Sequence, residues 1–155
     1  MDARLRYARV APGAHRAMLQ LEEYVQQSGL EHSLIRLVQT RASQINGCAF
    51  CLDMHTKDAR AAGESEQRLY LLSAWREAPF YSERERAALE WTEAVTLVAL
   101  DGVPDEVYER VRPHFSDEEL VNLTLAIATI NSWNRLNVAF RTPVGNYQPG
   151  KRGVS

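Results

Sequence analysis

The sequence predicts an all-α protein, a single-domain helical bundle of about six to eight helices over residues 1–155. Apolar residues recur at helical spacing in successive segments, which is typical of helices that bury one face. No segment alternates apolar and polar residues as a strand would. Two capping boxes, Ser82–Glu85 and Ser116–Glu119, indicate where two long helices begin. We expect a core at about residues 14–141 and an extended, Pro- and Gly-containing tail at 142–155.

The N-terminal part predicts an arm and two helices. Residues 1–12 are polar and mildly basic, and this arm ends at Pro12-Gly13. From Ala14 the apolar spacing predicts a helix that stops at Gly29. A second helix is expected at about His32–Ile45, with an apolar inner face. Arg41 lies on that face, and we interpret it as a side chain whose guanidinium reaches solvent. The alternative is that it stabilises an anion near the cysteines.

Further helices are expected after the cysteine-containing segment. A short one is predicted at Glu66–Arg76. The first capping box begins a helix to about Leu100, which is apolar on two sides and therefore central. A short helix at about Pro104–Arg112 has proline at its first position, where the missing N–H costs nothing. The second capping box begins a helix that reaches about Phe140.

Polar residues interrupt the apolar stripes of the two long helices. Glu93 is interpreted either as a glutamate satisfied by a neighbouring helix or the rim, or as a carboxyl with a raised pKa that relays protons. Asn131 and Asn134 continue the apolar stripe of the last helix. We expect these amides to be satisfied at a helix–helix or subunit contact. The alternative is that they line the cleft of the cysteines.

The motif that carries chemistry is Cys48-Ala49-Phe50-Cys51, followed by His55. Asn46-Gly47 predicts a turn before it, and the run to Ala62 predicts a helix that ends at Gly63. Residues three and four apart share a helix face, so both sulfurs and the imidazole point toward the interior or a cleft. A helix N-terminus stabilises a thiolate, and His55 can take or return a proton. Two such thiols can close and reopen a disulfide without any cofactor.

Two other interpretations of the cysteines are weaker. Cys48 and Cys51 could be half of a structural zinc site, but the chain has no second cysteine pair and its other histidines lack ligand spacing. They could also be ordinary small buried residues. The Asn46-Gly47 turn and the shared face with His55 favour a redox-active dithiol with no metal.

Composition restricts the remaining possibilities. The net charge of −2, with both signs interspersed, gives no basic surface for nucleic acid or membrane lipids. Met1–Arg6 lacks the apolar part of a secretory signal, and Leu123–Ile130, the longest apolar run, is too short to span a bilayer. We therefore expect a cytoplasmic protein, where a Cys-x-x-Cys pair is more often catalytic than structural. The apolar central helices, three Trp and six Tyr predict a homo-oligomer.

The block Ser43–His55 resembles the alkyl hydroperoxidase D-like members of the carboxymuconolactone decarboxylase family. The resemblance is strongest over Leu34–Gly63 and continues more loosely through Glu90–Ala94 and Ile130–Arg135. It implies an all-α fold, trimers or hexamers, and thiol-dependent reduction of hydroperoxides. The decarboxylase branch of the family generally lacks this cysteine pair, which argues against lactone decarboxylation.

The resemblance also implies roles for individual residues. Cys51 would be the thiolate that attacks the peroxide, Cys48 the resolving thiol, and His55 part of the proton relay. The reductant would be an external dithiol, which in that family can be a lipoylated carrier. The alternatives for the same dithiol are a protein disulfide reductase, a redox-sensing partner protein, and a helical oligomer whose motif is vestigial.

Two departures from the better-known pattern affect the relay. That pattern has a glutamate twelve residues before the first cysteine, where this chain has Arg36. It also has a histidine between the cysteines, where this chain has Phe50. The relay therefore cannot be transferred whole. Our hypothesis is that Glu93 supplies the missing carboxyl from another helix.

Overall fold

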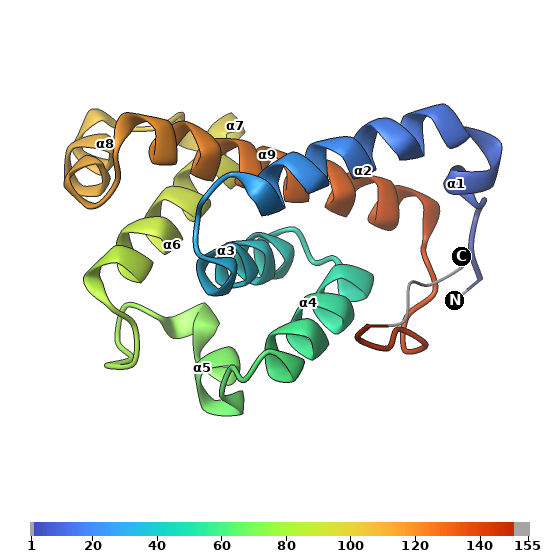
Figure 1. The fold of residues 1–155 in the computed structure, drawn as a ribbon, viewed down its shortest axis with the longest axis horizontal. Helices are drawn as coiled ribbons and strands as arrows, with labels where there is room; N and C mark the ends of the chain where they lie inside the picture. Colours follow the sequence, from blue (N-terminus) through green and yellow to red (C-terminus); the bar gives the residue numbers. More distant parts are fainter. Residues whose placement is uncertain (1, 151–155) are drawn as a thin grey trace.

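The computed structural model describes residues 2–150, and all regular structure in this range is helical, as predicted (Figure 1). The helices are α1 (Tyr7–Val10), α2 (Pro12–Gln27), α3 (His32–Ile45), α4 (Ala49–Ala61), α5 (Glu66–Tyr70), α6 (Glu83–Thr96), α7 (Val98–Asp101), α8 (Asp105–Val111) and α9 (Asp117–Phe140). Two short 3-10 turns, η1 (Leu72–Ala74) and η2 (Arg112–His114), join them.

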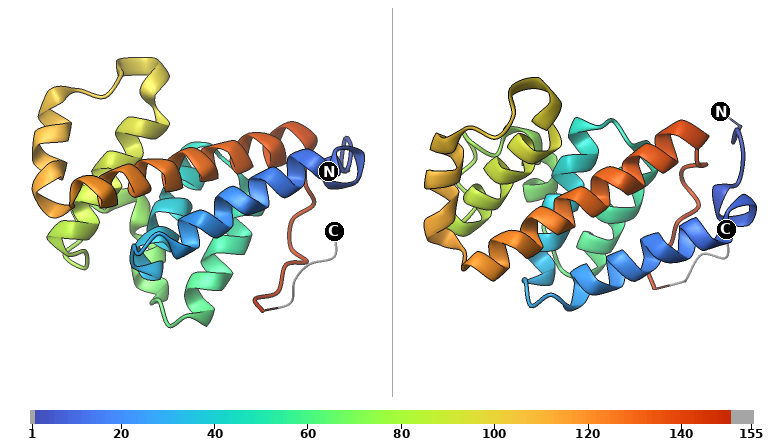
Figure 2. Two further views of the ribbon diagram at one scale, coloured as in Figure 1. Left: turned by 45° about the horizontal axis from the view of Figure 1, so that its top comes forward. Right: turned by 90° about the horizontal axis from the view of Figure 1, so that it is seen from above.

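Helix α3 is the centre of the molecule, because it packs against α4, α6 and α9. In Figure 1 it lies between a side formed by α2 and α9 and a side formed by α4 and α5. Helix α9, the longest in the described range, also packs against α2 and α6, and Figure 2 shows it crossing the molecule beside α2. The segments before α1 and after α9 lie at one end, where the Arg4 N–H donates to the Phe140 carbonyl at 3.0 Å.

Three clusters of buried apolar side chains hold the helices together. The largest joins α2, α3, α6 and α9, and a second joins α3, η1 and α6. The third is small and lies between α3, α4 and α9. Its members are Ala42, Cys48, Cys51 and Ile130, with Phe50 and Trp133 packed against them. The two cysteines are therefore core residues of the contact between α4 and its neighbours.

Local signals located the long helices correctly. Both capping boxes are present: the hydroxyl of Ser82 accepts from the Glu85 N–H and that of Ser116 from the Glu119 N–H, each at 3.2 Å. In return, each glutamate accepts from the serine N–H at 2.8 Å. Such a box satisfies two N–H groups that the first helical turn leaves unpaired. The predicted helix His32–Ile45 has the bounds of α3.

Several boundaries differ from the prediction. The helix expected at Glu66–Arg76 ends at Tyr70 and is followed by η1, and Pro104 is the N-cap of α8 rather than its first residue. Pro12 does not end the arm but is the first residue of α2, and the arm itself contains the single turn α1. The helix from Ser82 stops at Thr96, because Leu97 leaves helical geometry (φ −97°, ψ 18°), and the single turn α7 follows. Leu97, Val98 and Leu100 are consequently exposed, so the expectation of a central helix is wrong for this last part. These extra turns raise the α-helix count in residues 2–150 to nine.

The segment after α9 is irregular through residue 150, as expected for a tail. The rest of the predicted tail, 151–155, lies outside the described residues. Residues 142–150 nevertheless pack on α4. Lys57 donates to the carbonyls of Gly145 and Tyr147 at 3.4 and 3.1 Å, and the Tyr147 hydroxyl donates to Asp58 at 2.7 Å. Burial and this carboxylate raise the pKa of Tyr147 to about 12.

Candidate active site

Cys48 and Cys51 are joined by a disulfide at the beginning of α4. Their side chains are 1% and 0% exposed, and their Cα atoms are 5.4 Å apart. Cys48 is the N-cap of α4, and its sulfur accepts from the Cys51 backbone N–H at 3.4 Å. Gly47 turns the chain into the helix with φ +63°, a conformation that residues with a Cβ rarely adopt. The predicted position in the first turn of the helix holds for Cys51, while Cys48 lies just before it as the N-cap.

The turn before Cys48 is fixed to α9 by asparagines. Asn46 donates to the side-chain oxygens of Asn131 and Asn134, both at 2.8 Å. Asn134 in turn donates to the Ser43 hydroxyl at 3.0 Å, and Asn131 donates to Thr96 at 3.1 Å. These amides therefore satisfy one another at a contact between helices, as expected. The contacts hold the turn that carries the cysteines in one position relative to α9.

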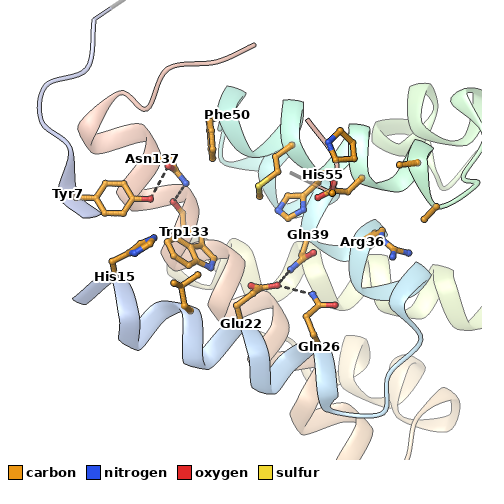
Figure 3. A pocket seen from close by; sticks show the side chains of 17 residues that line it. Tyr7, His15, Glu22, Gln26, Arg36, Gln39, Phe50, His55, Trp133 and Asn137 are labelled. Carbon is orange, nitrogen blue, oxygen red and sulfur yellow. Dashed lines mark hydrogen bonds between the residues drawn. The ribbon is translucent and has the colours of Figure 1, made fainter. Parts of the chain in front are cut away.

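His55 lies one turn beyond Cys51 and is 7% exposed. Burial lowers the pKa of its imidazole to about 4, so the ring is neutral near pH 7. Its Nε2 atom is buried and has no hydrogen-bond partner among residues 2–150. The ring lines a cavity of about 630 Å³ whose walls come from α1, α2, α3, α4, α9 and residues 149–150 (Figure 3). A neutral imidazole can accept a proton, and its lowered pKa makes it a weaker base than an exposed histidine.

Asn137 is a site residue that the sequence analysis did not find. Its Nδ2 donates to the Cys51 sulfur at 3.5 Å and to the Trp133 carbonyl at 2.9 Å, while its oxygen accepts from the Tyr7 hydroxyl at 3.2 Å. Asn137 is buried and lines the same cavity as His55. A donor to sulfur favours the thiolate over the thiol. The sequence offers one signal for it: Asn137 follows Asn134 by three residues and therefore lies on the same face of the helix.

Glu93 takes part in a different cluster. Its carboxylate accepts from Arg41 at 2.8 and 2.9 Å, from Trp75 at 2.8 Å and from Arg76 at 2.6 Å. Burial alone would raise the pKa of Glu93, but these hydrogen bonds outweigh it and the pKa lies below its usual value. Of the two interpretations of Glu93, the glutamate satisfied by a neighbouring helix is confirmed, and the raised pKa of the other is wrong. The interpretation of Arg41 as reaching solvent is also wrong, because its side chain is only 16% exposed. Glu93 does not line the cavity of His55, and its part in a relay stays a prediction.

Two further properties concern metals and membranes. Within the described chain, no three His, Cys, Asp or Glu side chains gather closely enough to hold a metal ion. The same residues include no helix with the length and apolar character needed to cross a bilayer.

The chain is similar to several known proteins. A model of the carboxymuconolactone decarboxylase family matches residues 12–94. The uncharacterized protein YdfG of Bacillus subtilis (strain 168) is 50% identical over 139 residues, which cover 90% of this chain and 95% of that protein. A crystal structure from Agrobacterium tumefaciens, of a protein of unknown function with a suggested role in antioxidant defence (AhpD), is 53% identical with a TM-score of 0.91. It covers 94% of this chain and 100% of that one.

A more distant structure shares the fold alone. It is the alkylhydroperoxidase AhpD core of an uncharacterized peroxidase-related protein from Ralstonia eutropha JMP134. The two chains are 19% identical with a TM-score of 0.78, over 90% of this chain and 74% of the other. The helical arrangement around the cysteine-bearing helix is therefore common to proteins of widely different sequence.

Proposed function

This chain belongs to the carboxymuconolactone decarboxylase family, with an AhpD-like fold, and we propose that it is a thiol-dependent peroxidase that reduces hydroperoxides through a Cys48–Cys51 dithiol/disulfide cycle. The observation that carries the proposal is the disulfide at the beginning of α4, one helical turn from a neutral imidazole that lines a cavity. This arrangement unites a pair of sulfurs that already bond, a proton acceptor and room for a small substrate.

The proposed cycle starts from the reduced pair. The Cys51 thiolate attacks the outer oxygen of a hydroperoxide, forming an S–O bond as the O–O bond breaks. The leaving alkoxide takes a proton, and Cys51 becomes a sulfenic acid. The Cys48 thiol then attacks the Cys51 sulfur, releasing water and forming the disulfide. An external dithiol reopens it by thiol–disulfide exchange and is itself oxidised.

The contacts of Cys51 support its role as the attacking sulfur. It lies in the first turn of α4, where the helix dipole favours an anion. Asn137 donates to it, and both Asn137 and His55 line the cavity. Cys48 is the helix N-cap and receives a backbone N–H instead. We assign proton transfer to His55, because its ring is neutral and one helical turn away.

The reductant, assembly and location are part of the same proposal. An external dithiol, for which a lipoylated carrier is one source, must return the electrons, so we propose a reducing, cytoplasmic environment. We also propose a homo-oligomer, a trimer or hexamer. Exposed apolar side chains support it, among them Leu97, Val98 and Leu100 around α7 and Val121 on α9. Light scattering on the purified protein would give the subunit number.

The test compares wild type with Cys51→Ser and Cys48→Ser. We expect wild type to consume cumene hydroperoxide with a dithiol donor and both variants to lose turnover. Cys48→Ser should still react once, and mass spectrometry should find one added oxygen on Cys51. An oxygen added to Cys48 of the Cys51→Ser protein, with none added to Cys51 of the Cys48→Ser protein, would reverse the assigned roles.

A second measurement separates peroxidase from disulfide reductase. Stopped-flow mixing of the reduced protein with hydroperoxide, and separately with a small disulfide, gives both rates of dithiol oxidation. The proposal requires the peroxide reaction to be much faster. A disulfide reaction that is faster by a similar margin would make the protein a disulfide reductase.

A further inference from the structure

Glu22 on α2 lines the same cavity as His55 and has a buried carboxylate oxygen without a partner among the residues that the structure describes. Its Oε1 accepts from the amides of Gln39, at 2.8 Å, and Gln26, at 2.9 Å. These two bonds, from different helices, fix the orientation of the carboxylate. Its Oε2 is buried without a hydrogen-bond partner in the described part of the chain. Native structures seldom bury a carboxylate oxygen in this way unless water or a ligand completes it.

His55 Nε2 has the same deficit, and these two are the only buried side-chain polar atoms left unpaired in residues 2–150. Both residues line one cavity, and Figure 3 shows Glu22 and His55 on either side of the Gln39 amide. The two atoms do not bond directly, because each lacks any partner. A molecule that both accepts and donates a hydrogen bond would satisfy them together.

The other titratable groups of this cavity are differently placed. Tyr7 donates to Asn137, and Asp58 accepts from Tyr147. His15 stacks edge-on against Trp133 and Tyr7. Arg36 also lines the cavity, at the position where the resembled pattern has its glutamate. Glu22 is therefore the cavity carboxylate with a buried oxygen that lacks a partner among the described residues.

We infer that Glu22 is the positioning carboxylate of the proton relay, joined to His55 Nε2 by one bridging water. The ring Nε2–H donates to the water, and the water donates to Glu22 Oε2. This arrangement fixes the tautomer with the proton on Nε2, which leaves the lone pair of Nδ1 available as a base. It also places a negative charge behind an imidazole whose burial disfavours the charged form.

The inference rests on the proposed peroxidase function for the step it serves. His55 takes the proton of the Cys51 thiol, and Glu22 stabilises the resulting imidazolium through the water. When the thiolate has formed the S–O bond, the same proton passes from His55 to the alkoxide and yields the alcohol. No net proton is gained or lost. In this relay Glu22, and not Glu93, supplies the carboxylate.

The test uses Glu22→Gln and the matched control Glu23→Gln, the same change one residue along α2 on an exposed side chain. The ¹⁵N chemical shifts of His55 near neutral pH report which ring nitrogen carries the proton. We expect the Nε2–H tautomer in wild type and Glu23→Gln, and a mixed or reversed tautomer in Glu22→Gln. Reaction of the reduced protein with hydroperoxide and with iodoacetamide should slow by about tenfold or more in Glu22→Gln alone.

Each outcome decides the matter. An Nδ1–H tautomer in wild type overturns the inference without any variant, so it stays testable if Glu22→Gln fails to fold. Slower reaction with an unchanged tautomer would make Glu22 structural and also overturn it. Iodoacetamide reads the thiolate without peroxide. A protein inert to hydroperoxide, whose tautomer and alkylation still depend on Glu22, would refute the peroxidase and leave the relay standing.

Discussion

Mild acid should destabilise this protein through His55. The ring is buried, and burial lowers its pKa from 6.5 to about 4. Between these two pH values, His55 is protonated in the unfolded chain but neutral in the folded protein. Stability is therefore complete above pH 6.5 and falls as the pH drops toward 4. Between about pH 7.5 and pH 5, linkage gives a loss of about 2 kcal/mol in the free energy of unfolding.

The chosen pH range isolates the imidazole. Glu31, Glu93 and Glu119 also have pKa values below their usual 4.5. A carboxyl with a lowered pKa loses its contribution only as the pH falls through and below its unfolded value. Their share of the acid effect thus appears mostly below pH 4.5, beneath the range in which His55 acts.

The assay is urea unfolding of the oxidised protein at both pH values, followed by far-ultraviolet circular dichroism. Wild type is compared with His55→Leu, which cannot titrate, and with His32→Gln, a change of an exposed histidine. We expect wild type and His32→Gln to lose about 2 kcal/mol and His55→Leu to lose much less. Equal losses in wild type and His55→Leu would refute the assignment of the buried neutral form to His55.

Three other substitutions test contacts described above. Asn137→Ala removes the donor to Cys51, so the thiol pKa measured by alkylation against pH should rise by about one unit; an unchanged profile contradicts this. Glu93→Gln should lower the free energy of unfolding by about 1–3 kcal/mol, because Arg41 loses its ionic partner, with no change in the pH profile of the peroxide reaction. A changed profile would restore Glu93 to the relay. Lys57→Ala removes two hydrogen bonds to residues 145 and 147, so their amide hydrogens should exchange faster while those of α3 do not.

Sequence reasoning succeeded where structure depends on near neighbours. The boxes at Ser82 and Ser116 act over three residues, and helical spacing put Cys48, Cys51 and His55 on one face. Each of these is decided within one or two helical turns. Short-range rules therefore located the dithiol and its imidazole without knowledge of the fold.

The rest of the site depends on contacts between distant segments. Glu22 looks like an ordinary charged residue of an amphipathic helix, and only the packing of α2 against α9 beside α3 and α4 directs it into the cavity. Glu93 interrupts an apolar stripe for a different reason, since it faces Arg41 of α3 and a tryptophan and arginine beyond η1. Composition and spacing do not distinguish these two carboxylates. The end of α6 at Thr96 was likewise missed, because no local sequence signal at Leu97 predicts it.

The walls of the cavity beside His55 come from distant parts of the chain. Helices α2, α3 and α4 supply Glu22, Gln39 and His55, while Tyr7 and residues 149–150 come from opposite ends of the described residues. Among the described contacts, Tyr7 reaches the sulfur only through its hydrogen bond to Asn137. A change at Tyr7 would therefore alter a wall of the cavity and, through Asn137, a contact of the Cys51 sulfur at the same time.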